Sequence, residues 1–326
     1  MDLGLRTTTY KDTFLVIHLE SLRVNSILEF DLYIDNGSEL VLYRNALMPF
    51  TEKNRQSLLD NNIRQLYVSS SMRDMYQRYI EQNIKEIIDD DSIEDTVKAG
   101  IVYDSANLLV REVLSKPTLR ENIERTEEMV ENTVTFILQK KSAFRNLLKV
   151  MSFDYYTYTH SVNVCTFSLA LAKQVGMEGI DELNILGTGA ILHDVGKTKI
   201  SEAILNKKEP LTSEEIALIR KHPEWGFEIL KETDIISPAS YYPIVQHHER
   251  EDGSGYPKGA GSHEIHRFSK IVAIADVFDA MTTRRVYRSA IDPYPALKEM
   301  YQGHKMFDCE LLEKFIRLMG PDSKSL

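Results

Sequence analysis

Five histidines and two aspartates in the second half of the chain have side chains that could bind metal ions. They are His160, His193, Asp194, His222, His247, His248 and Asp276. Asp194 comes two residues after the apolar run at 190–192, and Asp276 stands inside the apolar run at 271–278. A carboxylate among apolar residues is costly to bury unless a partner compensates its charge. Both aspartates therefore require cationic partners.

Imidazole and carboxylate groups together suit Fe, Mn or Zn, and a mixed nitrogen and oxygen set with two aspartates suits a dinuclear site. Two ions about 3.5–4 Å apart can share a bridging carboxylate and a bridging hydroxide, which attacks phosphorus. Taken singly, each motif has an ordinary interpretation, since a lone histidine is usually a hydrogen-bonded core residue and His247-His248 could lie at a helix C-terminus. The ordered combination predicts a metal centre built from separate segments of a helical bundle.

Three motifs give the chain a specific resemblance. HDVGK at 193–197, HHEREDGSGYP at 247–257 and DVFDAMT at 276–282 resemble the HD-GYP family, a bacterial branch of the HD phosphohydrolase superfamily. The resemblance covers roughly residues 126–320. The family hydrolyses cyclic di-GMP, so the resemblance implies a metal-dependent phosphodiesterase that produces pGpG or continues to GMP.

The resemblance also implies roles for individual residues. All seven side chains named above would bind metal, and Asp194 would bridge the two ions. His193, Asp194 and Lys197 would form the catalytic group. The expected substrate contacts are made by Lys197, Arg285 and Arg288 to phosphate, by Tyr256 through its ring or hydroxyl, and by Asp154 to a guanine. On composition alone, the two arginines could equally lie at a solvated helix end, and the loop around Tyr256 would be a surface turn.

Two positions depart from the family pattern. Some members carry a glutamate that supports a third metal where this chain has Tyr156. Val286 replaces the usual proline between the two basic positions, which should alter the stiffness of the loop more than its chemistry. We therefore expect two divalent ions and no third; the expected order is Fe, then Mn, although first-row ions compete for similar ligands.

The pattern of apolar residues predicts a mainly α protein with two domains and a connector. Residues 1–88 indicate a small α+β regulatory or interaction domain, with strands near 14–18, 30–34, 40–43 and 64–68, a helix after Thr51 and another at 71–88. Residues 89–125 are expected to form a helical connector interrupted at Pro117. Residues 126–326 are expected to form the all-helical HD-type bundle, with His160 on a helix at 156–175.

Composition limits the other classes of function. The formal net charge of −10 argues against binding a nucleic-acid polymer. Residues 1–6 lack the apolar core of a signal peptide, and no apolar run approaches the roughly 18 residues that cross a bilayer. We expect a cytoplasmic protein without membrane insertion, in which Cys165 and Cys309 are buried thiols.

Two alternatives to cyclic di-GMP hydrolysis stay open. The chain could be a signalling or adaptor protein that binds a cyclic dinucleotide with weak or no hydrolysis, or a hydrolase of a hybrid cyclic dinucleotide. The expected partners are cyclic di-GMP, a second copy of the chain, and a diguanylate cyclase or other signalling protein. Metal analysis separates enzyme from sensor, and turnover of a nucleotide panel separates the substrates.

Overall fold

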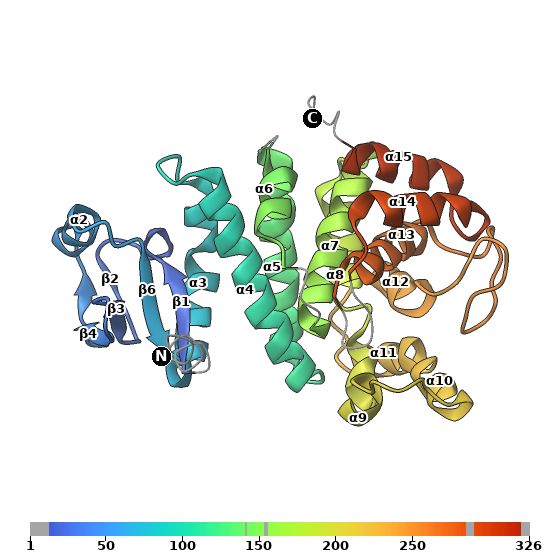
Figure 1. Ribbon diagram of the computed structural model, residues 1–326, viewed down its shortest axis with the longest axis horizontal. Coiled ribbons are helices and arrows are strands. Elements are labelled where there is room, and N and C mark those ends of the chain that lie inside the picture. Colours follow the sequence, from blue (N-terminus) through green and yellow to red (C-terminus); the bar gives the residue numbers. More distant parts are fainter. Residues whose placement is uncertain (1–12, 141, 153–155, 285–289, 321–326) are drawn as a thin grey trace, which may run out of the picture. The chain divides into compact units, whose positions relative to one another are not determined.

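The computed structural model describes residues 13–140, 142–152, 156–284 and 290–320 (Figure 1). The chain divides into two compact units, Met1–Ser105 and Ala106–Leu326. The first unit contains all the strands of the described residues, and the second is helical. The predicted fold class, a helical bundle with a small α+β domain, is confirmed. The three-part division at residues 88 and 125 stays a prediction.

The first unit is built on a small antiparallel sheet. Its strand order is β1-β6-β3-β4, and a separate pair is formed by β2 and β5. The elements are β1 (Phe14–His18), β2 (Ser26–Ile27), β3 (Leu32–Asp35), β4 (Leu40–Arg44), β5 (Pro49–Phe50), α2 (Glu52–Asp60), β6 (Gln65–Ser69), α3 (Arg73–Asp89) and the start of α4 (Asp95–Ser115). Leu32, Leu66 and Val68 are buried, and Phe30 meets Tyr76 and Tyr79 of α3 edge to face.

The predicted hairpin and helix start in this unit are confirmed. In the turn between β3 and β4, the side chain of Asn36 accepts hydrogen bonds from the amides of Ser38 and Glu39, and Gly37 has a positive φ of 87°. Thr51 caps α2 in a capping box with Asn54. Sequence patterning missed β2 and β5 because a two-residue strand is too short to show alternation.

The second unit contains the predicted bundle. Its helices are α5 (Arg120–Gln139), α6 (Ala143–Val150), α7 (Thr157–Gln174), α8 (Ile180–Ile191), α9 (Glu202–Leu205), α10 (Ser213–Ile219), α11 (His222–Lys231), α12 (Tyr241–Gln246), α13 (Arg267–Thr282), α14 (Pro293–Gln302) and α15 (Cys309–Met319). Short 3₁₀ turns include η3 (Val195–Lys199) and η4 (Pro238–Ser240). Pro117 separates α4 from α5 as predicted, since proline disrupts a helix interior.

Helix α7 is the centre of this bundle. Its residues from Thr159 to Ala172 are all buried, and it packs against α8 and α13 (Figure 1). Phe167 of α7, Phe278 of α13 and Phe315 of α15 form an edge-to-face cluster, with centroids 5.2 Å apart for the first two and 5.1 Å apart for the last two. Because aromatic packing of this kind fixes geometry, the helices that carry His160 and Asp276 are held side by side.

Glycines at two positions allow segments that carry candidate ligands to pack closely against one another. A Cβ at Gly189 of α8 would lie 2.5 Å from the carbonyl oxygen of Ser240, just before α12. A Cβ at Gly196 of η3 would overlap the carbonyl oxygen of His222 at the start of α11. The absence of a side chain at these positions brings α12 against α8, and α11 against η3.

Replacing Gly196 with alanine should therefore destabilise the helical unit, because the methyl group has only backbone to push against. Overpacking of this kind costs about 1–3 kcal/mol, occasionally more. Chemical denaturation would measure the loss. Gly261→Ala is the matched control, since its Cβ would meet nothing within 4 Å. Equal unfolding midpoints for the two variants would refute the close approach of η3 and α11.

One sequence expectation is wrong. Cys165 is a buried thiol, but Cys309 is exposed. Cys309 lies in the first turn of α15, where Asp308 caps the helix, and the apolar residues of the buried face begin at Leu311. Among the described residues, no helix is both long enough and apolar enough to cross a membrane.

Candidate metal centre

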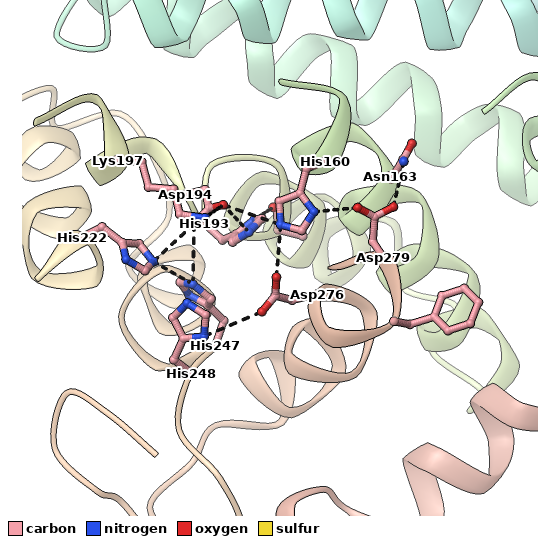
Figure 2. A network of polar contacts seen from close by, with 12 residues as sticks. His160, Asn163, His193, Asp194, Lys197, His222, His247, His248, Asp276 and Asp279 are labelled. Atoms are coloured by element: carbon pink, nitrogen blue, oxygen red, sulfur yellow. Dashed lines mark hydrogen bonds and ion pairs between the residues drawn. The ribbon is translucent and has the colours of Figure 1, made fainter. Parts of the chain in front are cut away.

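The seven candidate ligands lie together in the helical unit (Figure 2). His160 is on α7, His193 and Asp194 follow α8, and Asp276 is on α13. His222 begins α11, and His247 and His248 follow α12. All seven point toward one another, from segments that are up to 116 residues apart in the chain.

The candidate ligand atoms form two groups. His160, His193 and Asp194 have ligand atoms within 4.8 Å of one another, and so do His222, His247 and His248. Asp194 faces both groups with different oxygens. Its Oδ2 is 3.3 Å from Nε2 of His193, whereas its Oδ1 is 3.3 Å from Nε2 of His222. A carboxylate whose two oxygens face two separate donor groups could contact two cations.

Asp276 supplies a second carboxylate between the groups. Its Oδ1 is 3.1 Å from Nε2 of His160, and its Oδ2 is 3.7 Å from Nδ1 of His248. It lies on an apolar helix where its charge would otherwise be costly to bury. The centre therefore combines five imidazoles with two carboxylates. Each carboxylate faces histidines of both groups.

Backbone carbonyls fix the tautomers of three histidines. Nδ1 of His193, His222 and His247 donates to the carbonyl oxygens of Ala190, Ile219 and Pro243, at 2.7, 2.8 and 2.8 Å respectively. Because a carbonyl oxygen only accepts, Nδ1 carries the proton and Nε2 of the neutral ring presents a lone pair to the centre.

Burial and charge favour particular protonation states for four of the seven candidate ligands. Burial lowers the pKa of His222 to about 4 and lowers the pKa values of His247 and His248 well below the ordinary value. For Asp194, burial acts to raise the pKa, but the ammonium group of Lys197 holds it well below its usual range. These groups are thus in the states that metal ligation requires, neutral imidazole and ionised carboxylate.

The donor atoms fit divalent cations. Nε2 of His193 and Oδ1 of Asp194 are buried and make no hydrogen bond within the described residues. Nε2 of His222 and of His247 face each other at 3.1 Å, although both atoms present lone pairs. Buried lone pairs placed this close together need a cation or a proton between them. The nitrogen and oxygen donor set suits Fe, Mn or Zn.

The predicted substrate contacts are placed only in part. Nζ of Lys197 is 2.5 Å from Oδ2 of Asp194, so its ammonium lies at the edge of the cluster. Tyr256 is half-buried, with its ring stacked on His248. Tyr156, which stands at the family's third-metal position, is 57% exposed and stacks on Tyr158. Asp154, Arg285 and Arg288, together with Val286, lie outside the described residues.

Sequence reasoning missed the residues that support the ligands. Asp279 is fully buried, and its carboxylate accepts a 2.7 Å bond from Nδ1 of His160 and a 2.8 Å bond from Nδ2 of Asn163 (Figure 2). The bond to His160 directs Nε2 of that ring toward Asp276 and Asp194. A signal was present, because Asp279 follows Asp276 by three residues and thus shares its helix face.

Comparisons with known proteins agree with this geometry. A family model described as HD domain matches residues 124–311, which is more than half of the chain. The structure also resembles that of Bd1817, an HDG"Y"P protein from Bdellovibrio bacteriovorus, with a TM-score of 0.68 and 23% identity over 94% of this chain and 99% of that one. The latter similarity shows a shared fold that includes both units.

Three curated relatives are similar over half or more of the chain. A cyclic di-GMP phosphodiesterase of Pseudomonas aeruginosa is 33% identical over 59% of this chain, and one of Thermotoga maritima is 36% identical over 51%. A 3′3′-cGAMP-specific phosphodiesterase of Vibrio cholerae is 34% identical over 51%. The matches cover 46%, 45% and 36% of those relatives' own lengths. The chain thus spans less than half of each relative.

Proposed function

The chain belongs to the HD domain family, in its HD-GYP branch, and from that premise we propose that it is a metal-dependent phosphodiesterase that hydrolyses cyclic di-GMP. The relatives from Pseudomonas aeruginosa and Thermotoga maritima carry that activity in their names. The observation that carries the proposal is the position of Asp194, whose two oxygens face two different groups of histidines.

The cofactor of this proposal is a pair of divalent cations, Fe in preference to Mn. His160, His193 and Asp194 would hold one cation, and His222, His247 and His248 the other, with Asp194 and Asp276 contacting both groups. Such cations, when bound, supply Lewis acidity toward phosphate oxygens and acidify water for attack on phosphorus. With Tyr156 in place of the glutamate found in some family members, two cations and the linear product pGpG are proposed.

The chain's own residues would bind and orient the substrate. Lys197 has its ammonium at the edge of the cluster, where it can neutralise charge on a phosphate held there. Arg285 and Arg288 are proposed for the same task and Asp154 for a guanine, on the family resemblance. The N-terminal unit is proposed to serve regulation, through a second copy of the chain or a signalling partner.

A second candidate substrate is the hybrid cyclic dinucleotide 3′3′-cGAMP. Three of the similar Vibrio cholerae proteins are named 3′3′-cGAMP-specific phosphodiesterases, and they are 31–34% identical to this chain. Their sequence identities to this chain overlap those of the cyclic di-GMP enzymes, so overall similarity does not favour one cyclic dinucleotide over the other.

Turnover of a nucleotide panel tests the proposal. Purified protein loaded with Fe(II) or Mn(II) is incubated with cyclic di-GMP, 3′3′-cGAMP, pGpG and GMP, and the products are identified by chromatography and mass spectrometry. We expect conversion of cyclic di-GMP to pGpG with the highest kcat/KM. A clear preference for 3′3′-cGAMP would favour the second candidate. Binding of cyclic di-GMP without cleavage by the loaded protein would support the sensor alternative.

A further inference from the structure

His248 differs from the other four histidines in how its ring is oriented. His160 is held by Asp279, and His193, His222 and His247 are held by backbone carbonyls through Nδ1. For His248, the nearest acidic oxygen to Nδ1 is Oδ2 of Asp276 at 3.7 Å, which is beyond hydrogen-bond distance. Among the described residues, no hydrogen bond to this ring is found.

The loop that follows His248 supplies a different constraint. The ring of Tyr256 stacks on the imidazole of His248, with centroids 4.5 Å apart and an angle of 26° between the planes. The amide of Tyr256 also donates a 3.1 Å hydrogen bond to the carbonyl oxygen of His248. Arg220, two residues before the candidate ligand His222, places its guanidinium over the same tyrosine ring, 5.2 Å from the ring centroid. Tyr256 is thus attached to His248 through both backbone and side chain.

Two further residues fix Tyr256 in this position. A Cβ at Gly255 would lie 2.5 Å from the Cα of Glu249 and 2.5 Å from the carbonyl oxygen of His248, so only glycine allows the loop to approach this closely. Glu249 is 2% exposed. Its two carboxylate oxygens accept hydrogen bonds from the amides of Lys258 and Ala260, each at 2.8 Å. The buried carboxylate therefore ties down the loop on the far side of Tyr256.

We propose that Tyr256 and Glu249 are positioning residues for His248: the tyrosine ring holds the imidazole by stacking, and the buried glutamate holds the loop that carries the tyrosine. This role adds to the substrate contact predicted for Tyr256, and it rests on the proposed metal centre. Partners that orient a metal-binding histidine typically contribute about 10–100-fold to metal affinity. A stacked ring in place of a hydrogen bond leaves either ring nitrogen of His248 available to a cation.

Metal affinity measured on the full chain tests this inference without relying on turnover. Apoprotein is titrated with Co(II) against a competing chelator, and the visible spectrum of the bound ion reports its coordination. Tyr256→Ala should weaken binding of one cation by about 10-fold or more and shift the spectrum in the direction produced by His248→Ala. Tyr256→Phe should retain wild-type affinity because it keeps the ring. Glu249→Gln can accept only one of the two backbone-amide hydrogen bonds, so its metal affinity should lie between those of Tyr256→Ala and Tyr256→Phe.

Glu264→Ala is the matched control, since Glu264 has an exposed carboxylate that accepts a hydrogen bond from the amide of Gly261 in the same loop region. It should bind Co(II) as the wild type does. Wild-type affinity and spectrum in Tyr256→Ala and Glu249→Gln, alongside a clear loss in His248→Ala, would overturn the inference but leave the metal centre intact. Wild-type protein that binds no Co(II) at all would instead overturn the proposed function.

Discussion

Replacing both His193 and Asp194 with alanine is expected to abolish hydrolysis of cyclic di-GMP. The double variant loses one imidazole from the first histidine group and the carboxylate that faces both groups. Removing a single well-placed stabilising group commonly costs about 10²–10³-fold in rate, and here the cations that provide nucleophile and charge stabilisation lose their shared ligand. We expect at least about a 10³-fold loss of kcat/KM, together with a loss of bound metal.

The measurement is product formation under anaerobic conditions, with elemental analysis of the same samples. The chain offers a matched control in His263 and Glu264, an adjacent histidine and carboxylate that are both exposed. Alanine at both of these positions should leave turnover and metal content unchanged. Wild-type turnover in the His193→Ala, Asp194→Ala variant would refute the assignment of these two residues to the catalytic centre, whatever the metal content.

Replacing Asp279 with alanine is expected to reduce both stability and metal affinity. The change removes the acceptor of two buried hydrogen bonds, from His160 and Asn163. Loss of the partner of a buried polar group costs about 1–3 kcal/mol, and loss of the group that orients a metal-binding histidine costs about 10–100-fold in metal affinity. Denaturant titration of the apoprotein measures the first effect, and chelator competition measures the second.

Asp279→Asn separates the two effects. The amide keeps the volume of the carboxylate, but its oxygen can accept only from one side while its NH₂ group faces the other donor. We expect the asparagine variant to be destabilised less than the alanine variant and to bind metal less tightly than the wild type. Unchanged metal affinity in both variants would show that Asp279 has no role in orienting His160.

The candidate ligands were predictable because their chemistry resides in residue type. A buried carboxylate such as Asp276 in an apolar run requires partners wherever the chain folds, and the ordered histidines supply them. The helical class was predictable from the periodicity of apolar residues in the second half of the chain. The exposure of Cys309 was not, because the orientation of a residue in the first turn of a helix depends on how that helix docks.

The supporting residues could not be derived in the same way. The role of Asp279 depends on α13 lying beside α7, and the role of Glu249 depends on the path of a loop that returns to within hydrogen-bond distance nine and eleven residues later. Both are contacts of the folded chain, which spacing alone does not specify. Gly255 was expected in a loop, but the backbone that Gly255 and Gly196 approach could not be predicted from the sequence.

Anaerobic purification, followed by elemental analysis and a cyclic di-GMP cleavage assay on the same sample, tests the central claim most directly. The account predicts about two divalent ions per chain, conversion of cyclic di-GMP to pGpG, loss of both properties on chelation, and recovery of cleavage on addition of Fe(II) or Mn(II). Cleavage at an undiminished rate by protein stripped of metal would contradict it, as would a fully loaded protein that leaves cyclic di-GMP and 3′3′-cGAMP intact.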